Sequence, residues 1–186
     1  MHELHPNDFC REDTPWCYFV TSPIRSVEGL ARNLDYTQPF GGRHAVVRII
    51  RGQRCATPSA LFQEWAAALQ FPYYFGENWD AFVECMIDLQ WLPGSCYVFV
   101  VTQSDRVLPD SSSDFSILLR TLRWAHEQWK IPNRANMDEP IAPFTIVFHA
   151  EPENADAALA RIRAAGAVPV EARFSDEFIT LTTDRP

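Results

Sequence analysis

Apolar and polar residues alternate along the chain in blocks that predict strands interleaved with helices. Short runs that are almost entirely apolar, aromatic or β-branched are typical of strands covered on both faces. Four such runs stand at residues 16–20, 45–50, 97–101 and 144–148. Because segments with helical spacing separate them, the pattern predicts an α/β fold with a mostly parallel central sheet packed by helices.

The helical segments carry recognisable start and stop signals. Thr57-Pro58 begins one helix, Asn78 can cap the next, and Gly166 ends the last. These signals predict helices at 58–70, 78–89, 114–129 and 155–165, and a shorter one at 26–34 with Ser26 as its N-cap. Residues 131–143 are predicted as a surface loop, and residues 168–174 and 178–182 as one or two closing strands.

No repeat, low-complexity tract or long polar linker interrupts this pattern. The sequence therefore predicts a single domain over residues 1–186. With 47% hydrophobic and 22% charged residues, the composition is that of a globular protein and excludes a disordered chain.

The chain carries 24 acidic and 16 basic residues, a formal net charge of −8. Such a charge repels phosphate, so nucleic acid is not an expected partner. No apolar run approaches the ~20 residues of a membrane helix, and the N-terminus lacks the pattern of an export signal. We expect a cytoplasmic protein with no membrane contact, whose five cysteines, an odd number without a CxxC pair, remain reduced thiols.

Acidic residues are concentrated in the middle of the chain. Residues 55–105 contain six acids and no Lys or Arg. At ~100° per residue, four of the acids fall on one stripe of the predicted helix 78–89 and its N-terminal end, opposite the apolar face: Glu77, Asp80, Glu84 and Asp88. Like charges at i,i+4 spacing repel, so the stripe adds little to helix stability.

An aromatic loop, Tyr73-Tyr74-Phe75-Gly76, immediately precedes these acids. Aromatic side chains beside concentrated charge are typical of protein interfaces, and the complement of an acidic surface is a cationic partner. The alternative interpretation is an ordinary solvated helix face.

Residues 72–85, PYYFGENWDAFVEC, resemble the signature segment of the barstar family, intracellular inhibitors of barnase-type ribonucleases. The order of predicted elements over residues 44–150 also fits that family. The resemblance implies a barstar-like layered fold, with residues 1–43 and 151–186 as extensions that add strands and a helix to the same sheet.

The resemblance also implies which residues bind the partner. Asp80 and Glu84 would take the place of the substrate's phosphates in a ribonuclease active site. The full expected partner-binding set, with Asp88 added from the acidic stripe, is Tyr74, Phe75, Gly76, Asn78, Trp79, Asp80, Val83, Glu84 and Asp88. The implied function is that of a stoichiometric inhibitor, an immunity protein or antitoxin, with no catalytic residue, metal or cofactor.

The chain departs from the family pattern at three of these positions. Phe75 stands where the family has Tyr, Val83 where it has an aromatic residue, and Glu84 where it has Asp. A further acidic contact that the family makes from a later helix has no clear counterpart here, because either Trp124 or Glu127 falls at that position, depending on the register.

Two other functions remain open at this point. The target can be a basic effector other than a ribonuclease, or the carboxylates of Glu77, Asp80 and Glu84 can hold a divalent metal in a hydrolase. A zinc site formed by His2, His5, Cys10 and Cys17 is disfavoured, because its spacing matches no common pattern and a loosely packed N-terminus is expected.

Three further side chains receive structural interpretations. Cys85 is expected to be a buried structural thiol and His126 a surface residue. Glu64, off the acidic stripe, is expected to tolerate substitution with little effect on binding.

Overall fold

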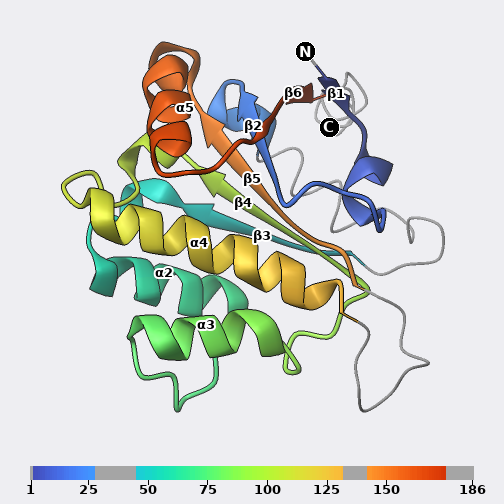
Figure 1. Ribbon diagram of the computed structural model, residues 1–186, viewed down its shortest axis with the longest axis vertical. Helices are drawn as coiled ribbons and strands as arrows, with labels where there is room; N and C mark the ends of the chain where they lie inside the picture. The colour runs from blue at the N-terminus through green and yellow to red at the C-terminus, as the bar shows by residue number, and fades with distance from the viewer. Residues whose placement is uncertain (1, 28–44, 132–141, 175–186) are drawn as a thin grey trace, which may run out of the picture.

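The computed structural model describes residues 2–27, 45–131 and 142–174. Its centre is a six-stranded sheet of order β1-β6-β2-β5-β4-β3, and every strand pair in it is parallel (Figure 1). The strands are β1 (His2–Leu4), β2 (Cys17–Thr21), β3 (Ala45–Arg51), β4 (Cys96–Thr102), β5 (Phe144–Ala150) and β6 (Val170–Phe174). The predicted α/β fold is confirmed.

The four longer predicted helices are confirmed to within two residues at each end. They are α2 (Pro58–Leu69), α3 (Trp79–Asp88), α4 (Ser112–Trp129) and α5 (Ala155–Ala164). Side chains of Thr57, Asn78 and Ser111 cap the first three. Gly166, with φ of +89°, lets the chain leave α5 in the left-handed conformation, and the Ala167 N–H donates to the Ile162 carbonyl.

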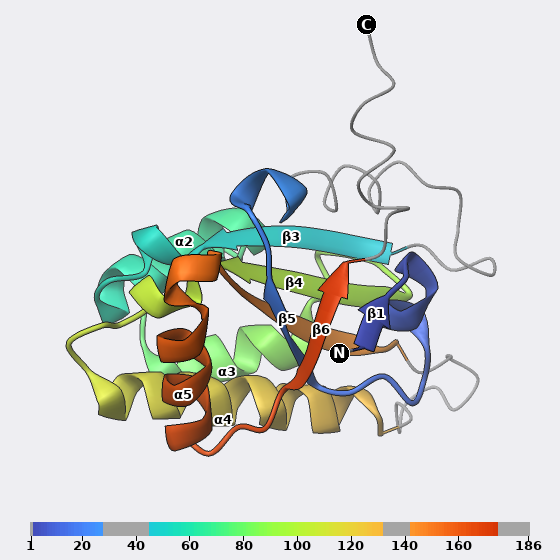
Figure 2. The ribbon, with the colours of Figure 1, turned by 90° about the horizontal axis from the view of Figure 1, so that it is seen from above.

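All four helices pack on one face of the sheet (Figure 2). The core beneath them includes Trp65, Phe82 and Phe99, each almost fully buried. Strands β4 and β5 are buried at every residue, because the opposite face is also covered. There the N-terminal residues Leu4 and Phe9 pack against the second set of sheet side chains.

Three strands lie outside the central region 44–150, namely β1, β2 and β6. Strand β2 pairs with β5 and β6, and β1 pairs with β6. The extensions thus continue the same sheet, as expected. Residues 24–27 are helical, so Ser26 lies inside a turn and is not its N-cap as expected. The remainder of the predicted helix 26–34, most of the loop 131–143 and the predicted strand 178–182 lie outside the described residues.

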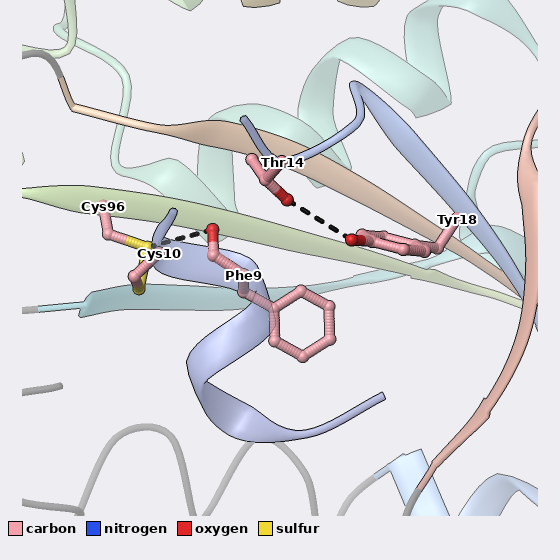
Figure 3. The surroundings of a disulfide bond; sticks show 5 residues. All are labelled: Phe9, Cys10, Thr14, Tyr18 and Cys96. Atoms are coloured by element: carbon pink, nitrogen blue, oxygen red, sulfur yellow. Dashed lines mark hydrogen bonds between the residues drawn. A yellow bond between two sulfur atoms is a disulfide. The ribbon is translucent and has the colours of Figure 1, made fainter. Parts of the chain in front are cut away.

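The expectations of a loose N-terminus and of uniformly reduced thiols are wrong. Cys10, at the end of the 3₁₀ turn η1 (Pro6–Cys10), forms a disulfide with Cys96 at the start of β4 (Figure 3). The neighbouring Phe9 is fully buried and meets the ring of Tyr18 edge-on, with centroids 5.8 Å apart. Since the Cys10 sulfur is already bonded, the zinc site considered above is excluded.

The other three cysteines are free and buried. Burial raises the pKa of Cys55 to about 12 and that of Cys85 to about 11, so both thiols stay protonated at neutral pH. The interpretation of Cys85 as a buried structural thiol is confirmed.

His126 is buried in α4 and is not the surface residue expected from its charged neighbours. Its Nδ1 lies 2.5 Å from the carbonyl oxygen of Phe144, at the start of β5. Burial lowers the pKa of His126, so the neutral ring donates its Nδ1–H to that carbonyl. The helical spacing of α4 already indicates burial at this position, because the buried residues Leu122 and Leu119 stand four and seven residues before His126 on the same face.

Glu64, expected to tolerate substitution with little effect on binding, is buried. Its carboxylate accepts hydrogen bonds from the Arg51 side chain at 2.7 Å to each oxygen and from the Arg51 N–H at 3.0 Å. Burial alone would raise the pKa of Glu64, but these bonds outweigh it and lower the pKa below its ordinary value. The pair joins α2 to the end of β3. A substitution of Glu64 would therefore affect folding stability, so it is unsuitable as a control in binding measurements.

Replacing Glu64 by glutamine is expected to lower the free energy of unfolding by about 1.5 to 3 kcal/mol, the usual worth of hydrogen bonds to a charged group. The depressed pKa adds a pH signature. The stabilisation is fully present at pH values above the pKa of Glu64 in the unfolded chain. It is lost as the pH falls through the lower pKa of Glu64 in the folded protein. Urea unfolding between pH 7 and pH 3 should therefore show a smaller acid-dependent loss in E64Q than in the unmodified chain; equal losses would contradict the assignment.

Candidate protein interface

Helix α3 presents its acids on a well-defined surface. Asn78 Oδ1 accepts the Ala81 N–H at 2.9 Å, which confirms the predicted cap and begins the helix at Trp79. The apolar side of α3, with Phe82, Cys85 and Met86, faces the core. Asp80 and Glu84 are therefore left on the exposed side, one helical turn apart, with the partly buried Asp88 one turn further on. We call Asp80, Glu84 and Asp88 the acidic row.

Glu77 does not belong to the acidic row, although the sequence placed it on the same stripe. It precedes the capping residue in the left-handed region, with φ of 46°, and its Oε2 accepts a 3.5 Å hydrogen bond from Gln63 Nε2. Because Asn78 must be extended to act as N-cap, the helical spacing cannot reach back to Glu77.

No cation within residues 2–27, 45–131 and 142–174 neutralises the two exposed acids of the row. Over the described part of the chain, Asp80 and Glu84 form neither an ion pair nor a side-chain hydrogen bond. The absence of Lys and Arg from residues 55–105 explains why. Within those same described residues, His, Cys, Asp and Glu also form no group of three able to hold a metal ion. The carboxylates are thus available to charges from outside the molecule.

The side chains of the aromatic loop before α3 point in different directions, two toward solvent and one toward the core. Tyr73 is 100% exposed and Tyr74 66%, with their rings edge-to-face at 5.7 Å. Phe75 instead packs inward, 4.9 Å from Phe71 and 6.1 Å from Phe62. Tyr73 is a candidate contact that the sequence reasoning missed; its place in a tight loop after Pro72 was the available signal.

Tryptophan side chains hold α3 at both ends. The Trp79 ring lies 5.0 Å from that of Phe62, and its Nε1–H donates to Asp114 Oδ1 of α4 at 3.3 Å. At the other end, Trp129 Nε1–H donates to the Met86 carbonyl at 3.0 Å. Trp79 is thus half-buried against the core and contributes to the positioning of α3, with only its exposed edge open to a partner.

Gly76 sits where a side chain would disturb the cap. A Cβ at this position would lie 2.9 Å from Asn78 Nδ2, which donates to the Gly76 carbonyl at 3.2 Å. Glycine therefore allows the loop to turn tightly onto the capping amide. Val83, the remaining expected contact, is half-buried.

Replacing Asn78 by alanine is expected to lower the free energy of unfolding by about 1 kcal/mol, because the Ala81 N–H loses its acceptor. Asn78→Asp is the matched control, since a carboxylate oxygen can accept the same N–H and a negative charge is favourable at a helix N-terminus. Urea unfolding followed by circular dichroism measures both. Equal destabilisation by the two substitutions would contradict a capping role.

The described helices include none that is both long and apolar enough to cross a membrane. No curated protein matches the chain. The family model described as Barstar (barnase inhibitor) matches residues 45–151, a region that runs from β3 to the end of β5 and contains the aromatic loop, α3 and α4. Members of that family are inhibitors and not enzymes. Because the match spans more than half of its residues, this chain belongs to the Barstar (barnase inhibitor) family.

Proposed function

We propose that this chain is an immunity-type inhibitor that binds a ribonuclease stoichiometrically and covers its active site with the acidic row of α3. A ribonuclease must gather Arg, Lys and His side chains to hold a phosphodiester. Carboxylates held at one-turn spacing on a rigid helix can pair with such a cluster without offering a bond to cleave. Family membership supports the inhibitor role, while the ribonuclease target is part of the proposal.

The observation that carries the proposal is the exposed, unpaired state of Asp80 and Glu84 on a helix held at both ends. Their charges meet none of the opposite sign within the described chain, so binding a cationic cleft costs no broken internal ion pair. The preorganised backbone also lowers the entropy lost on association. Residues 55–105 contain no Lys or Arg, so the acids of this segment give α3 a negative potential that accelerates encounter with a cationic enzyme.

The remaining expected contacts take different roles within this proposal. Tyr74, together with Tyr73, supplies exposed aromatic area. Phe75, Gly76, Asn78 and Trp79 position the loop and the start of α3, with their exposed edges available to the partner. Asp88, partly buried at the last turn, contributes to long-range attraction more than to direct pairing.

The experiment is a titration of RNA cleavage by a purified barnase-type ribonuclease with increasing amounts of this protein. We expect activity to fall linearly to zero at a 1:1 ratio. A basic DNase and a basic effector without nuclease activity serve as parallel targets. Inhibition of either of those, with the ribonuclease unaffected, would replace the ribonuclease assignment by immunity against another effector; absence of binding to all three would reject the inhibitor proposal.

A further inference from the structure

Apolar side chains are exposed directly beside the acidic row. Trp124 of α4 is 44% exposed and Ile87 of α3 36%, while Val83 of α3 is half-buried. We call these three residues the apolar seam. Trp124 is a large aromatic side chain whose exposure leaves much apolar surface in water, which is typical of a contact site.

The arrangement of α3 and α4 places the seam and the acidic row on one face. The two helices lie side by side and run in the same direction (Figure 1). The bond from Trp79 to Asp114 joins their N-terminal parts, and the bond from Trp129 to Met86 joins their C-terminal parts. These two bonds set the side of each helix that faces the other.

Each residue of a helix is turned ~100° from the residue before it, so the sides that face each other determine where the exposed residues lie. Val83 and Ile87 follow on the side of α3 next to α4, and Asp80 and Glu84 come next on the same outer face. On α4, Trp124 lies at the edge next to α3. Glu127 lies ~60° further round and away from α3. Of the two residues that the sequence left open, Trp124 therefore borders the proposed interface.

Charge changes sign across this face. Arg120 and Arg123 are exposed on α4, on the far side of Trp124 from the acidic row. A cation of a partner is therefore attracted to α3 but not to the edge of α4. A partner cation over this edge would meet like charges, whereas an apolar patch covers Trp124 without that repulsion.

We propose that the apolar seam is the second half of the partner-binding surface and that the partner is an enzyme whose active-site cations are bordered by an exposed apolar patch. This rests on the proposed function and narrows its target. Cations of the partner lie over Asp80 and Glu84, and its apolar patch covers Trp124 and Ile87. The seam then selects among cationic ribonucleases, since one with a charged border would leave Trp124 against an unpaired charge.

The test measures association and dissociation rates of the barnase-type ribonuclease at several salt concentrations. Trp124→Ala is expected to raise the dissociation rate about tenfold or more, and Ile87→Ala several-fold, with the salt dependence of association unchanged. Asp80→Ala is expected to flatten that salt dependence. Val168→Ala, at an apolar side chain 80% exposed between α5 and β6, is the matched control and should change neither rate. Thermal unfolding confirms that each variant folds.

Two results would overturn the proposal while leaving the inhibitor function intact. One is a dissociation rate within twofold of the unmodified value for both Trp124→Ala and Ile87→Ala, alongside clear weakening by Asp80→Ala. The other is tighter binding by Trp124→Glu, which would place a partner cation opposite α4. If the unmodified chain does not bind the ribonuclease, both the proposed function and the proposed role of the apolar seam are rejected. That outcome is distinguishable from the two results above, in which the unmodified chain binds.

Discussion

Asp80→Ala is expected to weaken binding of a barnase-type ribonuclease by at least about 2 kcal/mol, roughly 30-fold in the dissociation constant. The carboxylate is exposed in the free protein but would be enclosed among partner cations in the complex. Its removal leaves those cations desolvated without a counter-charge, which accounts for most of the expected loss. Isothermal titration calorimetry or the rate measurements above would give the difference.

Asp156→Ala is the matched control for this substitution. Asp156 occupies the first turn of α5 as Asp80 occupies the first turn of α3, and both side chains are exposed. The two changes therefore remove the same charge from the same place relative to a helix dipole. Only Asp80 lies on the proposed interface, since α5 packs at the other end of the molecule (Figure 1). Equal effects of the two substitutions on binding would reject the acidic row as the contact.

Reduction of the Cys10–Cys96 disulfide is expected to lower the free energy of unfolding by about 2 to 5 kcal/mol. The bond joins residues 86 apart in sequence, so it removes much conformational freedom from the unfolded chain. Urea unfolding with and without dithiothreitol would measure the change. In a reducing cytosol the same two residues would be held as thiols, so the compartment decides how much of this stability the protein has.

The double variant Cys10→Ala/Cys96→Ala is the control for this measurement. It should be as unstable as the reduced protein and insensitive to dithiothreitol. The remaining cysteines, Cys17, Cys55 and Cys85, are already free and buried, so the reductant leaves them unchanged. An unmodified chain whose urea midpoint is the same in both conditions would contradict a stabilising disulfide.

The sheet and helices that surround the site were predictable because each carried a strong local signal. Helix α3 has a capping Asn78 and an apolar face with helical spacing. Strands β4 and β5 are almost entirely apolar runs, which are typical of strands buried on both faces. These signals depend on neighbouring residues alone, so no tertiary information was needed to read them.

Features that depend on distant residues could not be predicted in the same way. Strand β1 has three residues and is too short for a periodic pattern, and it exists because β6 pairs with it. Sequence offers no reason to pair Cys10 with Cys96 among five cysteines. Glu64 differs from an exposed acid only through Arg51, a residue 13 positions earlier on another element.

Within the candidate site, the sequence located the acids better than the aromatic rings. Helical spacing was enough to put Asp80 and Glu84 on one face. It did not separate the outward Tyr73 and Tyr74 from the inward Phe75, because loop residues follow no such period. The apolar seam was equally hidden, since Trp124 and Ile87 belong to different helices that only tertiary packing brings together.

The pairing of β2 with β5 and β6 determines when the N-terminal part of the protein can be completed during synthesis. Strand β2 leaves the ribosome early, but its partners begin at residues 144 and 170. Before then, β3, α2, α3 and β4 are already exposed and can pack from local contacts. An apolar strand that stays unpaired for most of translation is a binding site for a chaperone. We therefore expect a chaperone to bind the nascent chain at β2 earlier than at α3.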